Sequence, residues 1–286
     1  TEFEREEIDL NLKKIYSLLH SDGNLGIIKF LHVDSIDYCT FGNSKPFRIK
    51  IRNILNDNYT HFYIKKADAS RVYGLELEHI LSPDKINFLV YKDTLIEEHI
   101  LGIPGDVFIE KHLDQCSPQE KAQIAKEFVK FNERCLIGLL GDMRSYNYVV
   151  IPAHDFDQVV YRIRPIDFDQ QCYEGNLKIY LPQYFKENKK MVEMVYDRLK
   201  PNSIEQYRKE VRSAIAKRAS TDGRLPHLLE IMKRDEISKP EHVEELKAGL
   251  HKLTYSIQFK KCQSMGEILE TGLNFVIRNY NNSNVR

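Results

Sequence analysis

The sequence predicts an α+β protein, in which a small antiparallel β-sheet lobe carrying one helix is followed by a larger, mainly helical lobe. Short runs of β-branched and aromatic residues, separated by turn residues, recur before residue 100. From about Pro182 onward the chain reads almost wholly as helices punctuated by Pro and Gly. We expect the first lobe to span residues 1–110 and the second residues 111–286, a length sufficient for two lobes.

The first lobe is predicted to open with a helix and to continue mainly as strands. Apolar residues recur at helical spacing from Glu4 to about Leu19, which indicates a lead-in helix (Ile8, Leu12, Ile15 and Leu19). A second, short helix is predicted from Ala69 to Leu81. The β-like runs, of which the first three are expected to pair antiparallel, are residues 36–40, 47–54, 59–66, 86–91 and 94–100.

The second lobe is predicted to begin with a long helix whose start is marked by a capping box. Ser117 can cap it, with Pro118 at the first helical position and Glu120 three residues after the cap. Ser203 and Gln206 are interpreted as the start of another helix. The inward face of the long helix is predicted to carry Ile124, Ala125, Phe128 and Phe131. Two β-like segments follow this helix, at residues 146–151 and 159–166. Later helices are expected to be separated near Pro226, Pro240 and Gly266.

Composition excludes several classes of partner and site. The 42 basic residues balance the 42 acidic ones, so we expect neither nucleic acid nor a membrane surface as a partner. No apolar run approaches the roughly 18 residues of a membrane-spanning helix. The 5 cysteines are scattered without a C-x-x-C pair, which argues against a disulfide framework or a cysteine zinc site and suits a reducing cytoplasm. The oligomeric state is left open.

The most informative stretch contains Asp142, Asn147 and Asp167. Phosphoryl transfer from ATP requires a carboxylate on the acceptor hydroxyl, hard oxygen ligands for Mg²⁺ and cations on the phosphates. Asp142 and Asn147 lie five residues apart between a helix and a strand, and Asp167 ends an apolar strand. These residue types in this order indicate ATP-Mg²⁺ chemistry.

The segments Leu140-Gly141-Asp142 through Asn147 and Ile166-Asp167-Phe168 resemble the catalytic loop and metal motif of a known family. It is the aminoglycoside phosphotransferase and choline kinase branch of the protein-kinase-like superfamily. The resemblance implies a bilobal protein-kinase-like fold, with Asp142 as catalytic base and with Asn147 and Asp167 as Mg²⁺ ligands. Arg144 lies where protein kinases often carry a lysine that neutralises the transferring phosphate, although an ordinary ion pair is the alternative.

The same resemblance extends into the first lobe, over about residues 60–172 in all. Lys65 ends a predicted strand that resembles the strand carrying the nucleotide-binding lysine of the family, so it would reach the α- and β-phosphates of ATP. The alternative is that Lys65 is a solvated charge at the end of a strand. Glu78, or else Glu76, would pair with that lysine. Backbone groups around Glu98, His99 and Ile100 would hold the adenine (residues 98–100).

The chain also departs from the family pattern. Leu140 replaces the usual His of the catalytic loop. Asp169 replaces the Gly of D-F-G and is a further candidate for contact with a metal. Instead of a glycine-rich loop there is only the turn at residues 41–44. Residues 152–158 are predicted to form the tip of a hairpin, and the Asp155-Phe156-Asp157 imitation of the metal motif is interpreted as a loop.

These patterns favour an ATP- and Mg²⁺-dependent phosphotransferase that acts on a hydroxyl of a small-molecule acceptor. A small acceptor is preferred because no long activation segment with an A-P-E ending follows Asp167, and the helices after residue 182 would shape its pocket. The nucleotide is expected in the cleft between the lobes. The alternatives are a catalytically idle kinase-like regulatory or binding domain, a protein kinase, or a nucleotidyltransferase on the same scaffold.

Overall fold

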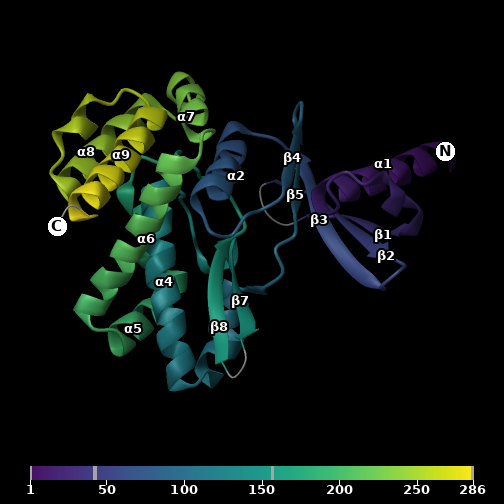
Figure 1. The fold of residues 1–286 in the computed structure, drawn as a ribbon, viewed down its shortest axis with the longest axis horizontal. Helices are drawn as coiled ribbons and strands as arrows, with labels where there is room; N and C mark the ends of the chain where they lie inside the picture. Colours follow the sequence, from purple (N-terminus) through teal and green to yellow (C-terminus); the bar gives the residue numbers. More distant parts are fainter. Residues whose placement is uncertain (1, 41–43, 156–157, 285–286) are drawn as a thin grey trace. The chain divides into compact units, whose positions relative to one another are not determined.

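The computed structural model describes residues 2–40, 44–155 and 158–284 (Figure 1). It confirms the predicted α+β class: a five-stranded antiparallel sheet with a helix comes first and a larger, mainly helical part follows, consistent with a kinase-like two-lobed layout. Two compact units result. The sheet unit comprises Thr1–Asp68 and Ile86–Ile100, and the helical unit comprises Ala69–Lys85 and Leu101–Arg286.

The sheet unit contains one long helix and all five strands of the larger sheet. The strand order is β1-β2-β3-β5-β4, and every neighbouring pair is antiparallel. The elements are α1 (Glu2–His20), a 3₁₀ turn (Leu25–Phe30), β1 (Leu31–Tyr38), β2 (Phe47–Asn53), β3 (Asn58–Lys66), β4 (Phe88–Tyr91) and β5 (Thr94–Glu98). The helix and the last four strands lie within about two residues of their predicted bounds, whereas β1 begins at Leu31, five residues before the predicted run of 36–40.

The core of the sheet unit lies between α1 and one face of the sheet. Leu12 and Leu19 of α1 pack with Ile51 of β2 and Phe62 of β3, all of them buried. Alternate positions of a strand point to opposite faces, so the buried residues of β2 leave its charged residues on the other face. Ile8 follows the same helical spacing but is 51% exposed, so the buried stripe of α1 begins only at Leu12.

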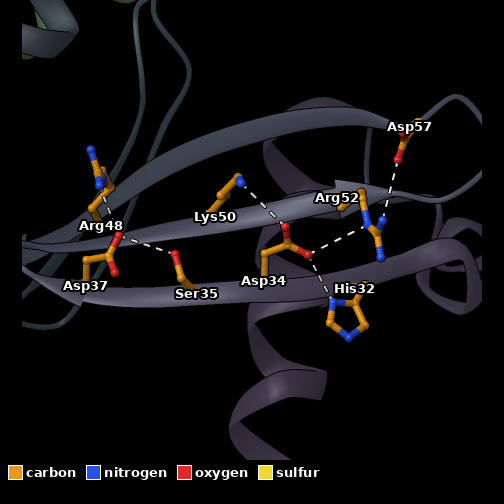
Figure 2. Close-up of polar contacts among 8 residues, drawn as sticks. All are labelled: His32, Asp34, Ser35, Asp37, Arg48, Lys50, Arg52 and Asp57. Atoms are coloured by element: carbon orange, nitrogen blue, oxygen red, sulfur yellow. Dashed lines mark hydrogen bonds and ion pairs between the residues drawn. The ribbon is translucent and has the colours of Figure 1, made fainter.

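The opposite face of β1 and β2 carries a network of charged side chains (Figure 2). Arg48 donates to Asp37 over 3.0 Å, and this hydrogen bond holds the pKa of the Asp37 carboxyl below its usual value. Asp34 lies 3.5 Å from Lys50 and 3.7 Å from Arg52. The cations of β2 are therefore balanced locally, in line with the even overall charge.

The helical unit contains the remaining elements, including a smaller sheet of order β6-β7-β8. Its strands and principal helices are α2 (Ala69–Leu81), β6 (Ile103–Pro104), α3 (Gly105–Val107), α4 (Pro118–Gly138), β7 (Tyr148–Asp155), β8 (Gln158–Pro165), α5 (Lys189–Arg198), α6 (Pro201–Thr221), α7 (Leu225–Arg234), α8 (Pro240–Thr254) and α9 (Met265–Asn284). In Figure 1, α4 and α6 run side by side, and the β7–β8 hairpin lies along α4. The hairpin strands pair as far as Asp155 and Gln158. Residues 156–157, part of the segment that the sequence interprets as a hairpin tip and loop, lie outside the described ranges.

The two helix starts predicted from capping patterns have different outcomes. At α4, the Ser117 hydroxyl accepts from the Glu120 amide over 3.2 Å, and the Glu120 carboxylate accepts from the Ser117 amide over 2.8 Å, so the capping box is confirmed. The start at Ser203 is wrong, because α6 already begins at Pro201 and Ser203 lies inside its first turn. Proline lacks an amide hydrogen and suits the first helical position, which fixes the earlier start.

The helix α2 belongs to the core of the helical unit. Its Leu77, Ile80 and Leu81 are buried in one cluster with residues of α6, α7, α8 and α9. The units therefore divide on either side of α2 and after Ile100, whereas the sequence placed one boundary at residue 110. Because α2 packs there, the sheet unit is assembled from two separate stretches of chain.

Two further properties concern the whole chain. None of the described helices is both long enough and apolar enough to cross a membrane. All five cysteines lie in described ranges and are free thiols, so disulfides play no part in holding the fold.

Candidate active site

The loop that follows α4 places Asp142 at a sharp turn. Leu139 ends α4 in the left-handed conformation with φ 53°, and Asp142 also has a positive φ of 54°. The turn is held by backbone bonds, since the Asp142 amide donates to Ile179 over 3.0 Å and its carbonyl accepts from the Arg144 amide over 2.7 Å. Met143 is buried beneath the loop, while the Asp142 side chain stays 31% exposed. The fold thus presents this carboxylate at the surface of a fixed loop.

Asn147 lies directly beside Asp142. Its Nδ2 donates to the Asp142 carbonyl over 2.8 Å and lies 3.4 Å from Oδ2 of the same residue. The two residues that the sequence singled out by their five-residue spacing are therefore in direct contact, and the hydrogen bond between them closes the loop from residue 142 to residue 147. The side-chain oxygen Oδ1 of Asn147 accepts no hydrogen bond from a residue in the described ranges. This leaves a hard oxygen donor next to the carboxylate.

The β7–β8 hairpin brings Asp167 to the same place. Asn147 precedes β7 and Ile166 follows β8, and the Ile166 amide donates to the Asn147 carbonyl over 3.0 Å. On the other side, the amide of Gly141 donates to Gln170 over 3.2 Å. The loops carrying Asp142 and Asp167 are therefore hydrogen-bonded neighbours, and the Asp167 side chain is 35% exposed.

Arg71, near the start of α2, is a site residue that the sequence did not reveal. Its Nη2 lies 3.4 Å from the Asp169 carboxylate and its Nε 4.0 Å from that of Asp167. Asp169, considered from the sequence as a further metal contact, is thus paired with a cation. Arg71 carries no motif and is separated from Asp169 by 98 residues, so no local signal could have identified it.

Arg144 forms ion pairs on two sides. Its Nε donates to Asp142 Oδ1 over 2.8 Å and its Nη1 to Glu187 Oε1 over 3.0 Å. The hydrogen bond to Asp142 is the main cause that raises the pKa of the Arg144 guanidinium. The guanidinium also lies 5.0 Å from the centre of the Phe185 ring. Arg144 is therefore held as a fixed cation beside the carboxylate that the sequence assigned as a base.

Asn188 supports the loop that carries Asp142, in which Leu140 stands in place of the expected His. Its Nδ2 donates to the carbonyls of Met143 and Pro182 over 3.0 and 2.8 Å, and its Oδ1 accepts from the Tyr148 hydroxyl over 2.8 Å. Asn188 is fully buried, so these bonds replace all contact with water. The sequence pattern of the loop gave no sign of this residue, which lies more than 40 positions away.

Lys65 lies in the sheet unit, where its ion-pair partner is Glu97 of the neighbouring strand β5. Both side chains are 7% exposed. Lys65 is opposite Leu95 in the ladder, so Glu97 is its diagonal neighbour on the same face. Lys66 points to the other face of β3, as expected from the alternation along a strand, and is exposed.

The two glutamates proposed as partners of Lys65 lie on α2, in the helical unit. Burial raises the pKa of Glu78, and the charges of Arg134 and Arg164 oppose this shift. Glu76 is one of the charges felt by Arg224, at the start of α7. Each of the two glutamates thus interacts electrostatically with arginines of the helical unit.

The predicted adenine-binding segment ends β5. The amide of Glu98 donates to the Asn87 carbonyl over 3.0 Å, and the amide of His99 donates to the His61 carbonyl over 3.1 Å. These two amides are used inside the sheet unit. The Ile100 amide donates to no other residue in the part of the chain that the structure describes. Residues 41–43 of the turn considered for phosphate binding lie outside the described ranges.

The oxygen donors of the helical unit suit Mg²⁺ by their chemistry. Carboxylates of Asp142 and Asp167 and the amide oxygen of Asn147 are hard ligands, and Mg²⁺ usually takes one or two carboxylates together with phosphate oxygens. Within the described ranges, no three His, Cys, Asp or Glu residues form a cluster able to enclose a metal ion by themselves.

Comparison with known proteins adds no relative. No protein-family profile matches this chain, and no curated protein matches it.

Proposed function

We propose that this chain is an ATP- and Mg²⁺-dependent phosphotransferase that moves the γ-phosphoryl group to a hydroxyl of a small-molecule acceptor. The observation that carries the proposal is the pairing of two loops in the helical unit. Asp142 and Asn147 lie in one loop, Asp167 lies in the other, and the bond from Ile166 to Asn147 joins them. Carboxylates and an amide oxygen in this arrangement suit phosphoryl transfer.

Asp142 is assigned the role of orienting and deprotonating the acceptor hydroxyl. The acceptor oxygen forms a bond to the γ-phosphorus, the bond from that phosphorus to the bridging oxygen of ADP breaks, and the hydroxyl proton passes to the carboxylate. Asn147 and Asp167 would hold Mg²⁺, and the ion would offset negative charge on the phosphates. Arg144 is already held beside Asp142, where a cation stabilises charge on a transferring phosphoryl group.

Lys65 and the segment 98–100 are assigned to the nucleotide. The ion pair with Glu97 fixes the Lys65 ammonium on the sheet, and a lysine held in this way can bind the α- and β-phosphates. With the amides of Glu98 and His99 used in the sheet unit, Ile100 is the remaining amide donor of the segment for an adenine nitrogen.

A small acceptor is preferred to a protein because the chain turns back directly after the Asp167 motif. Leu140 and Gln171 form an isolated antiparallel bridge, and the Cys172 amide donates to the Leu139 carbonyl over 2.9 Å. The chain after Asp167 therefore returns to the end of α4 within five residues, and it does not form a long segment there that could bind a peptide substrate.

A catalytically idle domain that binds nucleotide for regulation is the second candidate. One observation favours it: the Asp142 carboxylate is already paired with Arg144 over 2.8 Å. In an idle domain that ion pair would persist when nucleotide binds, whereas in the enzyme the acceptor hydroxyl must reach the carboxylate.

The Asp142→Asn variant tests the catalytic assignment. We expect turnover to fall by roughly 10²–10⁴-fold because the general base is lost, while Mg-ATP binding stays within about twofold. Turnover is measured as ADP release during a screen of hydroxyl compounds, and binding by titration calorimetry. Asp114→Asn is the matched control, since that side chain is 76% exposed. Equal loss of binding and turnover in Asp142→Asn contradicts the role.

The product identifies the reaction class. Mass spectrometry of the modified acceptor separates addition of a phosphate from addition of AMP, and phosphorylation of proteins is detected in the same way. Binding of Mg-ATP without product from any acceptor supports the idle domain.

A further inference from the structure

A cavity of about 740 Å³ lies in the helical unit among α4, α6, α8 and α9. Its volume falls within the range of roughly 300–1,000 Å³ that is typical of small-molecule sites. One side of the cavity is apolar and is formed mainly by the last helices of the chain (Leu250, Leu253, Phe259, Ile268, Phe275 and Val276). This side can receive a hydrocarbon chain.

The other side of the cavity is polar and charged. Arg208, Lys209 and Arg212 of α6 and Glu133 of α4 all line it. Glu133 is buried and lies 2.6 Å from Arg212 and 3.9 Å from Arg208. Glu205 lies 3.1 Å from Arg212. Three cations of the lining are therefore set against Glu133 and against Glu205, which lies just outside the lining. In the described part of the chain the exposed Lys209 forms no ion pair, which leaves one positive charge in excess.

We infer that this cavity binds a single-chain amphiphile with an apolar tail and one terminal carboxylate. The tail lies against the apolar wall formed by α8 and α9, and the head group lies near Lys209 and Arg212. One surplus positive charge is balanced by a monoanion, and a dianionic head group would leave a negative charge without a partner. The class of ligand is thus a fatty-acid-type monocarboxylate.

The cavity is distinct from the candidate active site. Its lining includes none of Asp142, Asn147 and Asp167. The two places share one stretch of chain, because Leu181 lines the cavity whereas Ile179, two residues earlier, accepts a hydrogen bond from the Asp142 amide. The inference needs no phosphotransfer, so it is tested independently of the proposed function.

Gly272 of α9 offers a variant that fills the cavity without a clash. It belongs to the lining, and an added Cβ would meet no atom within 4 Å. In Gly272→Phe, we expect palmitate binding to weaken by at least about tenfold, because the ring occupies the place of the tail. Gly223→Phe is the matched control, since a Cβ at Gly223 also meets open space and this residue lies outside the cavity.

The charged side is tested by Lys209→Gln, which should weaken palmitate binding by about fivefold, as expected for the loss of a partly exposed charge pair. Arg212 is left unchanged, because its removal would strand the buried Glu133. Binding is measured by titration calorimetry below the critical micelle concentration, with the circular dichroism spectrum of each variant as the check on folding. Gly272→Leu replaces Gly272→Phe if the larger side chain alters that spectrum.

The head group and the tail are tested with ligands of matched length. Laurate should bind more tightly than dodecyl phosphate, dodecyltrimethylammonium should bind at least about tenfold more weakly than laurate, and acetate should not bind. Equal binding of the cationic and carboxylate amphiphiles overturns the inference. So does palmitate affinity that is the same in wild type, Gly272→Phe and Gly223→Phe.

Discussion

At the scale of single residues, the backbone of Asp142 is, together with that of Leu139, one of the strained points of the candidate site. Its φ of 54° is in the left-handed region, which costs a non-glycine residue about 1 kcal/mol. Hydrogen bonds to Ile179, Arg144 and Asn147 offset that cost and hold the turn. The position of the carboxylate therefore depends on neighbours as much as on its own sequence.

Asn188→Ala should destabilise the protein by about 3 kcal/mol. The substitution leaves the Tyr148 hydroxyl and the carbonyls of Met143 and Pro182 without their partner in a buried place. Urea unfolding followed by far-ultraviolet circular dichroism measures the loss. Asn202→Ala, at an exposed position of α6, is the control and should change stability by less than about 0.5 kcal/mol. Similar midpoints for both variants would argue against the supporting role.

The sequence pointed to Asp142, Asn147 and Asp167, which lie in two neighbouring loops, but it could not predict the contacts that reach the candidate site from elsewhere in the chain. Asp142 and Asn147 lie within one loop, so their spacing alone was enough to bring them together. The partner of Lys65 could not be predicted, because the diagonal contact with Glu97 depends on the register between β3 and β5. Arg71 contacts the site from a distant part of the chain, where no motif precedes it.

At the scale of elements, α4 is joined to β8 through its own capping residue. Besides completing the capping box with Ser117, the Glu120 carboxylate accepts from the Tyr161 hydroxyl over 2.7 Å. The bond from Tyr161, and then those with Ser117, lower the pKa of Glu120 from its ordinary value of 4.5. The start of the helix and the second strand of the hairpin are thus fixed by one carboxylate.

This arrangement predicts a pH dependence. A lowered pKa means that the stabilisation by Glu120 is present above pH 4.5 and is lost as the pH falls through the lowered value. In Glu120→Gln, which keeps the hydrogen-bonding shape without titrating, that part of the acid sensitivity should disappear. Urea midpoints measured between about pH 3 and pH 7 should converge for wild type and variant at the acidic end. Parallel profiles would exclude the effect.

Helix boundaries were predictable where one signal was present and were missed where two competed. The capping box at Ser117 and Pro118 had no nearby rival, and α4 begins there. Near α6, Ser203 offered a capping pattern and Pro201 offered a first-turn proline, and the proline determined the start. The short 3₁₀ turn at Leu25–Phe30 was missed because it has no periodic pattern.

At the scale of the whole molecule, sequence order and spatial grouping differ. The sheet unit is interrupted by residues 69–85, which belong to the helical unit. The succession of strands and then helices along the chain could be read from the sequence, but the grouping of α2 depends on Leu77 and Ile80 meeting residues of distant helices. A pattern along the chain indicates that a face is apolar, and it does not indicate what will cover that face.

A fragment of residues 1–110 should therefore contain a folded sheet and an unfolded α2. The helix has 13 residues, which is marginal for an isolated helix in water, and its buried partners lie after residue 110. Backbone chemical shifts should be native-like for β1 to β5 and random-coil for residues 69–85. A fragment with 69–85 replaced by a Gly/Ser linker should be equally stable, and native helical shifts for α2 in the 1–110 fragment would contradict the grouping.

The interruption of the sheet unit also sets an order of events on the ribosome. Strands β4 and β5 emerge soon after α2, so the sheet can close while most of the helical unit is still untranslated. The apolar side chains of α2 cannot be buried until α6 to α9 have been synthesised, because the residues of these helices that cover them lie between Val211 and Val276. During that interval the nascent chain exposes the apolar residues of α2, and slowing of translation after residue 100 would prolong the exposure.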